Sequence, residues 1–300
     1  MDISVIIVNY NTCALTCRCL DSIFANSRGV QFEVIVVDND SQNDESKQVL
    51  RQYHGIRYVQ SDTNVGFGKA NNLGFTYATG RYVLFLNSDT YLLNDALSAF
   101  VHEFDTLPDN VACVGAQLYS DDGKPNNSFS DLPSLCWYAK AVGGIFLYPF
   151  RRQRKNNQVA DVTVPTNPYE VPYAIGADLC VRREVIEKCG LFDPDFFMYY
   201  EDSEMQARYR RAGYRSMIVP SPKIVHLECA SNKSEQPKQY PAITRKWFLQ
   251  SQALYFKKEY SLPYYWIYRI ISLFSFPLYL RCYYTSVEKR MLMRTLLHPL

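Results

Sequence analysis

Polar side chains follow four apolar, strand-like runs of this sequence, at the point where each run ends. In an open α/β sheet the carboxyl ends of parallel strands meet at one edge, and ligands bind there. One such cluster alone is ordinary turn sequence, but four clusters that reach the same edge predict a binding site. The four clusters are Asn9-Tyr10-Asn11-Thr12, Asp38-Asn39-Asp40-Ser41, Asn64-Val65-Gly66-Phe67-Gly68 and Asn87-Ser88-Asp89-Thr90.

Two of these clusters contain carboxylates with a specific chemical use. Asp38 ends an apolar run, where it can accept a hydrogen bond from a pyrimidine imide or a ribose hydroxyl; capping of the next helix is the alternative. Asn87 and Asp89 lie two residues apart, and their oxygens can hold a hard divalent cation whose other ligands are water and a diphosphate. Such an ion offsets leaving-group charge. For Asp89, a plain surface turn is the alternative.

A further pair of carboxylates, Glu201 and Asp202, follows five bulky, mainly aromatic residues. Apolar surroundings raise the pKa of a carboxyl group, which can then act as a general base toward a hydroxyl. Simple enrichment of acids at a helix N-terminus is the alternative. His226 follows another apolar run and is either a further metal ligand or a structural histidine.

The glycines of the third cluster exclude some common nucleotide sites. Gly66-Phe67-Gly68-Lys69-Ala70 resembles a phosphate loop, but it is neither Gly-x-Gly-x-x-Gly nor a Walker sequence, since Ala70 replaces the required Ser or Thr. The segment therefore argues against a kinase, an NTPase or a dehydrogenase.

Alternating β-branched and amphipathic stretches must position these side chains, and they predict a doubly wound sheet. We expect strands over residues 3–8, 32–38, 56–60, 82–87 and 111–117, and helices over residues 14–26, 45–53, 69–78 and 95–105. Residues 120–170 show little periodicity and predict an irregular excursion. Beyond it we expect a strand from residue 173 into residue 178, helices over 182–188 and 201–212, and a strand over 216–219.

Composition places the chain among ordinary globular proteins: 300 residues, 47% hydrophobic and 21% charged, exclude a disordered chain, collagen and a coiled coil. The 9 cysteines include no C-x-x-C pair, which indicates buried thiols in a reducing compartment. The first residues are typical of a strand and not of a signal peptide.

The last 70 residues differ from the rest in charge. Residues 231–300 carry 11 Lys and Arg and 3 Glu, a net charge of +8, whereas residues 1–230 have a net charge of −6. Within residues 262–280, Ile267, Ile270, Ile271, Phe274 and Leu278 recur at helical spacing. Arg269 leaves too short an apolar run to span a bilayer. A helix in the membrane interface is our preferred interpretation, and packing of the same stripe on the main domain is the alternative.

The motifs, taken in order, resemble those of family-2 inverting glycosyltransferases of the GT-A fold, in particular the rhamnosyltransferase-like branch. The resemblance covers residues 3–260 and rests on Ser4-Val5-Ile6-Ile7-Val8-Asn9-Tyr10-Asn11, Val36-Val37-Asp38-Asn39-Asp40-Ser41, the 64–72 segment, Leu86-Asn87-Ser88-Asp89-Thr90, and Phe197-Met198-Tyr199-Tyr200-Glu201-Asp202 through Arg208.

The resemblance implies a role for the main candidates. Asp38 would contact the base, Asn87 and Asp89 would occupy the family's D-x-D position beside Mg²⁺ or Mn²⁺, and His226 would complete the metal site. Asp202 would be the general base, with Glu201 beside it. We expect the nucleotide sugar to lie against Asn9, Tyr10, Asn11, Asp38, Asp40, Ser41, Asn64, Gly66, Phe67, Asn71, Asn87, Ser88, Asp89 and Arg208.

The sequence departs from the family pattern at two positions. Asn87 stands where many members have Asp, and Cys229 stands where the H-x-x-G-x-S pattern has Gly, which weakens the expected metal site. The Q-x-x-R-W motif of processive synthases is missing, and only Thr244-Arg245-Lys246-Trp247 is found, which favours addition of a single sugar.

The resulting expectation is a GT-A domain over residues 1–230, with a nucleotide-sugar half at 1–118 and an acceptor half at 119–230, followed by a helical, membrane-associating extension at 231–300. The donor would be dTDP-rhamnose or a UDP-sugar, and the acceptor a glycan or lipid-linked glycan at the inner face of the cytoplasmic membrane. A non-catalytic, membrane-associated scaffold with the same fold is the alternative. A nucleic-acid-binding role is disfavoured because the body of the chain is net negative.

Overall fold

The computed structural model describes residues 1–140, 164–227, 241–279 and 285–299. They form two compact units. The first comprises Met1–Ser130, Thr163–Phe197 and Glu201–Lys233, and the second comprises Asp131–Val162, Met198–Tyr200 and Ser234–Leu300. The second unit therefore includes residues that the sequence analysis assigned to the 1–230 domain. The domain boundaries given there stay a prediction.

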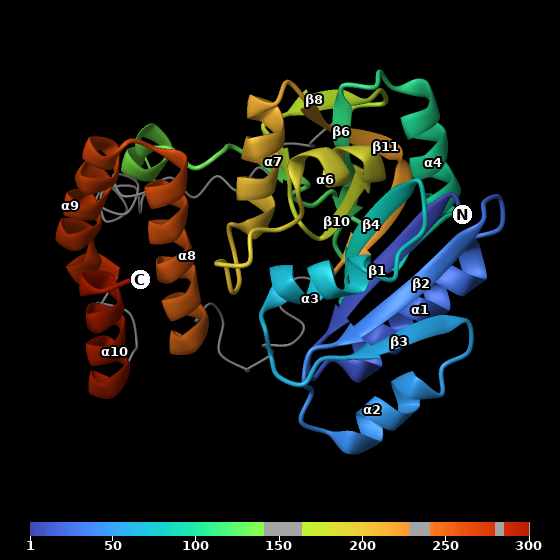
Figure 1. The fold of residues 1–300 in the computed structure, drawn as a ribbon, viewed down its shortest axis with the longest axis horizontal. Helices are drawn as coiled ribbons and strands as arrows, with labels where there is room; N and C mark the ends of the chain where they lie inside the picture. Colours follow the sequence, from blue (N-terminus) through green and yellow to red (C-terminus); the bar gives the residue numbers. More distant parts are fainter. Residues whose placement is uncertain (141–163, 228–240, 280–284, 300) are drawn as a thin grey trace. The chain divides into compact units, whose positions relative to one another are not determined.

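A mixed sheet of nine strands forms the first unit, in the order β3-β2-β1-β4-β10-β6-β11-β5, with β8 paired to β11 (Figure 1). The strands β1, β2, β3 and β4 are mutually parallel, as are β6 and β11, whereas β10 is antiparallel to both β4 and β6. The strands are β1 (Ile3–Asn9), β2 (Phe32–Asp38), β3 (Ile56–Gln60), β4 (Tyr82–Asn87), β5 (Thr90–Leu92), β6 (Val111–Tyr119), β8 (Tyr169–Val171), β10 (Asp178–Arg182) and β11 (Arg215–His226). The small strands β7 (Phe129–Ser130) and β9 (Tyr173–Ala174) pair separately.

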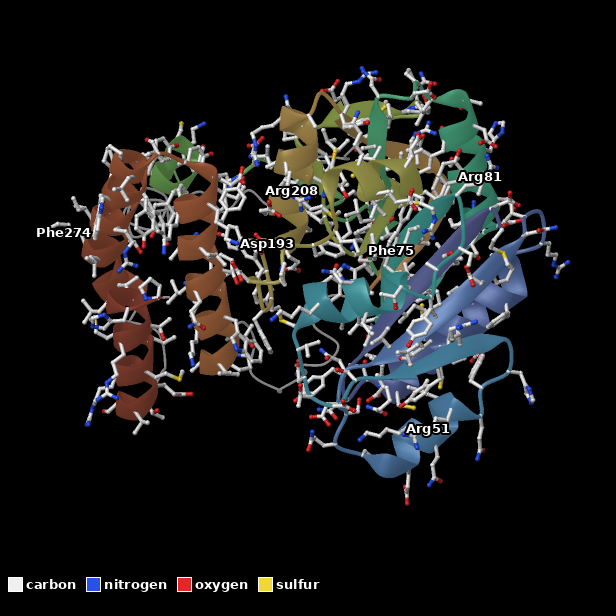
Figure 2. The ribbon with its side chains drawn as sticks, in the orientation of Figure 1. Arg51, Phe75, Arg81, Asp193, Arg208 and Phe274 are labelled. Atoms are coloured by element: carbon white, nitrogen blue, oxygen red, sulfur yellow. The ribbon has the colours of Figure 1, made fainter. Side chains whose placement is uncertain are left out.

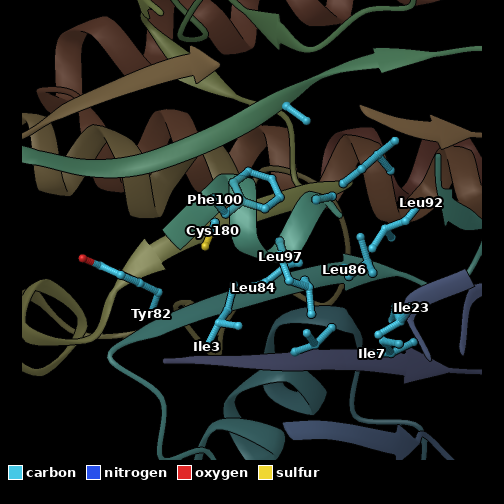
Figure 3. Packing of buried hydrophobic residues seen from close by; sticks show 14 of the residues in the cluster. Ile3, Ile7, Ile23, Tyr82, Leu84, Leu86, Leu92, Leu97, Phe100 and Cys180 are labelled. Carbon is cyan, nitrogen blue, oxygen red and sulfur yellow. The ribbon is translucent and has the colours of Figure 1, made fainter. Parts of the chain in front are cut away.

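Apolar side chains cover both faces of this sheet, because successive residues of a strand point to opposite faces. Ile3 and Ile7 of β1 pack with Leu84, Leu86 and Phe100 on one face (Figure 3). Other residues of the same strands, among them Ile6, Val83 and Phe85, belong to a second buried cluster on the opposite face. Runs that are apolar at every position are typical of sheets buried on both sides.

Helices cover the two faces: α1 (Cys13–Asn26), α2 (Asp44–Arg51), α3 (Phe67–Phe75), α4 (Ala96–Thr106), α6 (Arg183–Cys189) and α7 (Glu201–Arg211). The mainly parallel sheet flanked by helices confirms the predicted fold class, and the five strands predicted before residue 118 are all present.

Three predictions in the later part of the unit are wrong in detail. The strand predicted from residue 173 into residue 178 is interrupted: β9 ends at Ala174 and β10 begins at Asp178. Arg182 is the last residue of β10, and not the start of a helix. The strand predicted over 216–219 extends to His226, with a register shift between Val219 and Lys223 that accommodates two prolines unable to donate to the ladder.

The second unit contains three long helices, α8 (Ala242–Glu259), α9 (Leu262–Tyr279) and α10 (Ser286–Leu297). Its interior is aromatic: the rings of Phe256 and Tyr268 stack with centroids 4.2 Å apart, and Tyr138 packs edge-on against Tyr268. Gln252 donates to the Tyr200 hydroxyl at 2.7 Å and accepts from the Tyr268 hydroxyl at 3.2 Å. Tyr200 is therefore held by α8, whose Gln252 is in turn bound by Tyr268 of α9.

The two sides of α9 differ in exposure, and both interpretations of its apolar stripe stay predictions. Tyr265, Tyr268 and Arg269 are buried, whereas Trp266, Ile267, Ile270 and Phe274 are exposed, Phe274 by 80% (Figure 2). In the described part of the chain, no helix has the length and apolar character needed to cross a bilayer.

Candidate active site

The carboxyl ends of the four adjacent parallel strands bring the predicted polar clusters to one edge of the first unit. In the sheet register, Asn9 lies beside Asp38, Asp38 beside Gln60, and Val8 beside Asn87. β1, β2 and β4 are mainly apolar and buried until this point, so that burial of each strand fixes the position of the polar residue that ends it. The edge is therefore a row of amide and carboxylate groups.

Asp38 is the most buried of these groups, with 0% of its surface exposed. Its carboxylate accepts from Asn9 Nδ2 at 2.6 Å, from the Ser41 amide at 2.9 Å and from Gln60 Nε2 at 3.2 Å. Asn9 is itself held by Thr16, whose hydroxyl donates to Asn9 Oδ1 at 2.8 Å. The ladder of donors fixes one carboxylate orientation at the end of β2.

We expect Asp38→Asn to destabilise the first unit. The substitution places an NH₂ group among N–H donors, so that at least one buried donor loses its acceptor, at a cost of about 1–3 kcal/mol. Urea unfolding followed by circular dichroism would measure this loss. Asp40→Asn is the control: the Asp40 side chain is half-buried and its carboxylate forms no comparable set of hydrogen bonds in the described structure, so the unfolding midpoint should not change. Equal midpoints for Asp38→Asn and the wild type would contradict the prediction.

The backbone around Asn11 and Asp40 adopts an uncommon conformation. Both residues have positive φ, 56° and 66°, a region that non-glycine residues rarely occupy. The Ser41 hydroxyl accepts from the Asn11 amide at 2.9 Å, and Asn11 Oδ1 accepts from the Gln42 amide at 2.8 Å. These bonds join the loops after β1 and β2, while Tyr10 stays 40% exposed at the same edge.

The loop after β3 is held tightly against residue 197. Asn64 Oδ1 accepts from Asn39 Nδ2 and from the Gly66 amide, both at 3.0 Å, and the Phe67 amide donates to the Phe197 carbonyl at 2.9 Å. Gly66 has φ +88°, and a Cβ atom there would lie 2.2 Å from that carbonyl oxygen. Only glycine fits this position. Asn71, predicted to face the donor, donates to the Phe67 carbonyl at 3.1 Å.

Asp89 and His226 meet at the end of β4 and β11. His226 Nε2 lies 3.3 Å from Asp89 Oδ1, and the Leu227 amide donates to the Asp89 carbonyl at 3.0 Å. The hydroxyl oxygens of Ser88 and Thr12 lie 3.0 Å apart nearby. Asn87 is fixed through its backbone, which donates to the Ala177 carbonyl at 2.8 Å.

The residues at this end of β4 fit a divalent cation that takes most of its ligands from elsewhere. Asp89 and His226 provide one carboxylate and one imidazole in contact, which is a suitable donor pair for Mn²⁺ or Mg²⁺. Within the described residues, no group of three His, Cys, Asp or Glu side chains could hold a metal by itself. An ion here would depend on water and on the diphosphate of a ligand.

Glu201 and Asp202 begin α7, and both are held in a largely buried position. The Gly176 amide donates to Asp202 Oδ2 at 2.9 Å, and the Ser203 amide donates to Oδ1 at 2.7 Å. Burial raises the pKa of Asp202, while these two amides act in the opposite direction by stabilising the carboxylate. The Asp202 carboxylate is thus oriented from two sides by backbone groups.

Glu201 is only 6% exposed, and its Oε2 atom has no hydrogen-bond partner among the described residues. Burial, and then the charge of Asp202, raise the pKa of Glu201 to about 8. A carboxyl group in this position keeps its proton near neutral pH.

The titration of Glu201 makes the stability of the protein depend on pH. The pKa of an unfolded Glu lies near its ordinary value of 4.5 and that of the folded group is about 8, so the folded state binds the extra proton between these values. Stability therefore falls as pH rises through this window, by about tenfold in the folding equilibrium per pH unit. We expect Glu201→Gln, which cannot ionise, to abolish this slope.

Thermal unfolding of the wild type and of Glu201→Gln between pH 5 and 8 tests this. Glu187→Gln is a matched control, because this glutamate on α6 is 60% exposed. Parallel pH profiles for wild type and Glu201→Gln would show that Glu201 is ionised in the folded protein.

The guanidinium of Arg208, which is labelled in Figure 2, binds other groups of the protein. It forms two hydrogen bonds with Glu204, at 3.0 and 3.1 Å, and donates to the backbone carbonyls of Cys189, Gly190 and Leu191. This geometry fixes the turn after α6 against α7. A contact of Arg208 with the donor stays a prediction.

Sequence reasoning missed two polar residues close to this edge. Gln60 ends β3 and binds Asp38, and the strand-end rule that selected Asn9 and Asn87 could have found it. Asp178 begins β10, is fully buried, and accepts from the Ala116 amide at 2.7 Å. Burial raises the pKa of Asp178 to about 7. The sequence analysis predicted a strand that reaches residue 178, but it gave no sign that this strand runs antiparallel between β4 and β6, which is what buries Asp178.

Comparison with known proteins connects this edge to a family. The family model of glycosyl transferase family 2 matches residues 4–189, which include β1 to β4 and the polar clusters that end them. The chain belongs to glycosyl transferase family 2. The GT-A fold and the family resemblance inferred from the motifs are confirmed.

Individual relatives of this family 2 member are distant. The chain is 25% identical over 244 residues to rhamnosyltransferase WbbL of Escherichia coli (strain K12), covering 78% of the chain and 85% of WbbL. It is 25% identical over 229 residues to the O-antigen biosynthesis protein RfbC of Myxococcus xanthus, covering 72% of the chain but only 16% of RfbC.

Among solved structures, the mannosyltransferase PcManGT from Pyrobaculum calidifontis, in complex with GDP-Man and Mn²⁺, superposes with a TM-score of 0.56. The two proteins are 19% identical, and the match covers 98% of this chain and 69% of PcManGT. At this identity the likeness concerns the fold.

Proposed function

We propose that this family 2 glycosyltransferase moves one sugar from a nucleotide diphosphate sugar to a hydroxyl of a glycan or lipid-linked glycan, with inversion, in the synthesis of a cell-surface polysaccharide. The observation that carries the proposal is the Asp202 carboxylate, which two backbone amides orient in the same unit as the polar strand ends. The rhamnosyltransferase relative favours dTDP-rhamnose as donor; a UDP-linked hexose is the next candidate.

Different residues at this sheet edge would bind different parts of the nucleotide sugar. Asp38, held at the end of β2 by its hydrogen-bond donors, would contact the base or ribose, and Gly66 lets the loop after β3 lie directly against the Phe197 carbonyl. Asp89, Asn87 and His226 would hold Mg²⁺ or Mn²⁺, which neutralises the charge of a departing diphosphate when bound.

Asp202 acts on the acceptor. Its carboxylate takes the proton of the acceptor hydroxyl while the oxygen forms a bond to the anomeric carbon, and the bond from that carbon to the nucleotide diphosphate breaks on the opposite side. One displacement of this kind inverts the anomeric centre. Glu201, which keeps its proton, does not compete with Asp202 for the acceptor proton.

Calorimetric titration with dTDP and with UDP, each with and without Mn²⁺, tests the nucleotide site. The proposal expects metal-dependent binding of at least one nucleotide, and the preferred base narrows the list of donors. A protein that binds neither nucleotide would instead be the non-catalytic scaffold.

We further propose that α9 attaches the enzyme to the inner face of the cytoplasmic membrane. The support is its exposed face, which presents Leu262, Trp266, Ile267, Ile270 and Phe274 from a segment of net positive charge. Interfacial helices combine such an apolar face with attraction to anionic lipid.

We expect at least tenfold less of the double variant Ile270→Glu and Phe274→Glu to sediment with phosphatidylglycerol vesicles than of the wild type. The reason is that the variant places two anions on the face of α9 that would enter the lipid. Val49→Glu is the matched control, an apolar side chain on α2 that is 51% exposed. Unchanged sedimentation of the double variant would refute attachment through α9.

A further inference from the structure

The second unit contains a cleft of about 750 Å³ between α8 and α10. Basic side chains line much of it: Lys246 from α8, Arg290 and Arg294 from α10, and His298 from the residue that follows α10. We name these four residues and the space between them the basic cleft. Nothing in the proposed transfer reaction uses it.

The cations of the basic cleft are not neutralised by the described protein. Arg290 and Arg294 lie one turn apart on α10, where like charges repel. Neither they nor Lys246 form an ion pair with any carboxylate in the described ranges. The nearest acid in sequence, Glu288, accepts instead from the backbone and side chain of Thr285 in a capping box at the start of α10. A bound anion would relieve this repulsion.

The end of α10 would ordinarily disfavour an anion, because the C-terminus of a helix carries partial negative charge. Arg269 of α9 removes this obstacle. Its guanidinium is buried, 6% exposed, and Nη2 donates to the carbonyls of Leu296 and Leu297 at the last turn of α10. Its Nη1 atom is buried and has no hydrogen-bond partner among the described residues. A full positive charge therefore lies under the helix end beside the basic cleft.

Apolar side chains share the same cleft. Val287, Met291 and Leu297 line it together with the cations, and Val287 and Leu297 are 74% and 50% exposed. A ligand that fits both parts carries an anionic group and a hydrocarbon chain. Arginine pairs of this kind favour phosphate, whose oxygens accept several N–H groups at once.

We propose that the basic cleft binds the phosphate group of a lipid, with the hydrocarbon chain along Val287, Met291 and Leu297. The inference extends the proposed membrane attachment and lipid-linked acceptor, and rests on them for the source of the lipid. The phosphate can belong to a polyisoprenoid carrier or to an anionic phospholipid, which present the same chemistry to the cleft.

Calorimetric titration of the full chain with farnesyl phosphate tests the proposal. Farnesol, inorganic phosphate and dihexanoyl phosphatidylglycerol are the companion probes, all below their micellar concentrations. We expect farnesyl phosphate to bind at least tenfold more tightly than farnesol or inorganic phosphate, with affinity that falls as salt rises. Tight binding of farnesyl phosphate alone identifies an isoprenoid source, and equal binding of the phosphatidylglycerol identifies membrane phospholipid.

The double variant Arg290→Gln and Arg294→Gln should lose this affinity at least tenfold. Both side chains are exposed, so the variant should fold, and unchanged thermal unfolding verifies it. Lys257→Gln with Lys258→Gln is the matched control, two exposed cations of α8 outside the cleft. Full affinity in the arginine variant, or equal affinity for inorganic phosphate and farnesyl phosphate, would overturn the proposal.

Nucleotide titration separates this inference from the proposed function. Excess UDP should not displace farnesyl phosphate, and the arginine variant should bind nucleotide like the wild type. If the protein binds farnesyl phosphate in the basic cleft but neither dTDP nor UDP, the transferase proposal is refuted and the lipid site is retained. If UDP displaces farnesyl phosphate, the lipid phosphate binds in the nucleotide site and the present inference is overturned.

Discussion

Asp202→Asn should lower kcat for sugar transfer by about 10²–10⁴-fold, the range that a positioned general base contributes. The variant keeps the size of the side chain and can still accept from the Gly176 amide through its remaining oxygen, but it cannot take a proton from the acceptor. We therefore expect the effect on kcat, with nucleotide affinity changed little. Transfer from a radiolabelled nucleotide sugar, measured at saturating donor, reports it.

Two comparisons make this result specific. Asp105→Asn should transfer at the wild-type rate, because Asp105 binds Arg81 and Tyr82 at the amino end of β4, opposite the strand ends that carry the site. Glu201→Gln should retain most activity near neutral pH, since the glutamic acid that it replaces keeps its proton. If Asp202→Asn transfers sugar as fast as the wild type, Asp202 is not the general base. If the wild type shows no transfer, the non-catalytic scaffold is the remaining alternative.

The sheet edge could be predicted because its determinants are local. The runs that become β1, β2 and β4 are mainly apolar and each ends in a polar residue, and parallel strands place such ends together. The order of polar residues along the chain was therefore enough to select Asn9, Asp38 and Asn87 before any contact was known.

The partners of these residues could not be predicted, since they depend on tertiary contacts. Gly176 donates to Asp202 only because the chain turns between β9 and β10, a break that no periodicity showed. The carbonyls bound by Arg208 belong to a turn 17 to 19 residues earlier. Asp178 is buried because β10, of which it is the first residue, lies between β4 and β6.

The C-terminal helices show a second limit of pattern analysis. Helical spacing identified an apolar stripe on α9, but spacing does not tell which side of a helix packs on the protein. Arg269, which in the sequence interrupts an apolar run, is a buried residue bound to the end of α10. The stripe residues Ile267, Ile270 and Phe274 are the exposed ones.

Asp89→Ala should remove the metal-dependent part of nucleotide binding, which we expect to be at least tenfold in affinity. In the described structure Asp89 is the carboxylate that contacts His226, and Asn87 is neutral, so no second described carboxylate of the motif could hold the ion in its place. The expected signature is a variant that binds dTDP or UDP equally with and without Mn²⁺.

Asp105→Ala is the matched control for this titration and should keep the full response to Mn²⁺, since its carboxylate lies at the amino ends of the strands. Asn87→Asp provides the opposite change: a second carboxylate beside Asp89 should strengthen metal-dependent binding, because each added anionic oxygen increases the affinity for a hard cation. The effect of Mn²⁺ on nucleotide affinity could instead persist in Asp89→Ala and be unchanged by Asn87→Asp. That result would place the ion away from the end of β4, and the amides of the neighbouring loops would then have to bind the diphosphate.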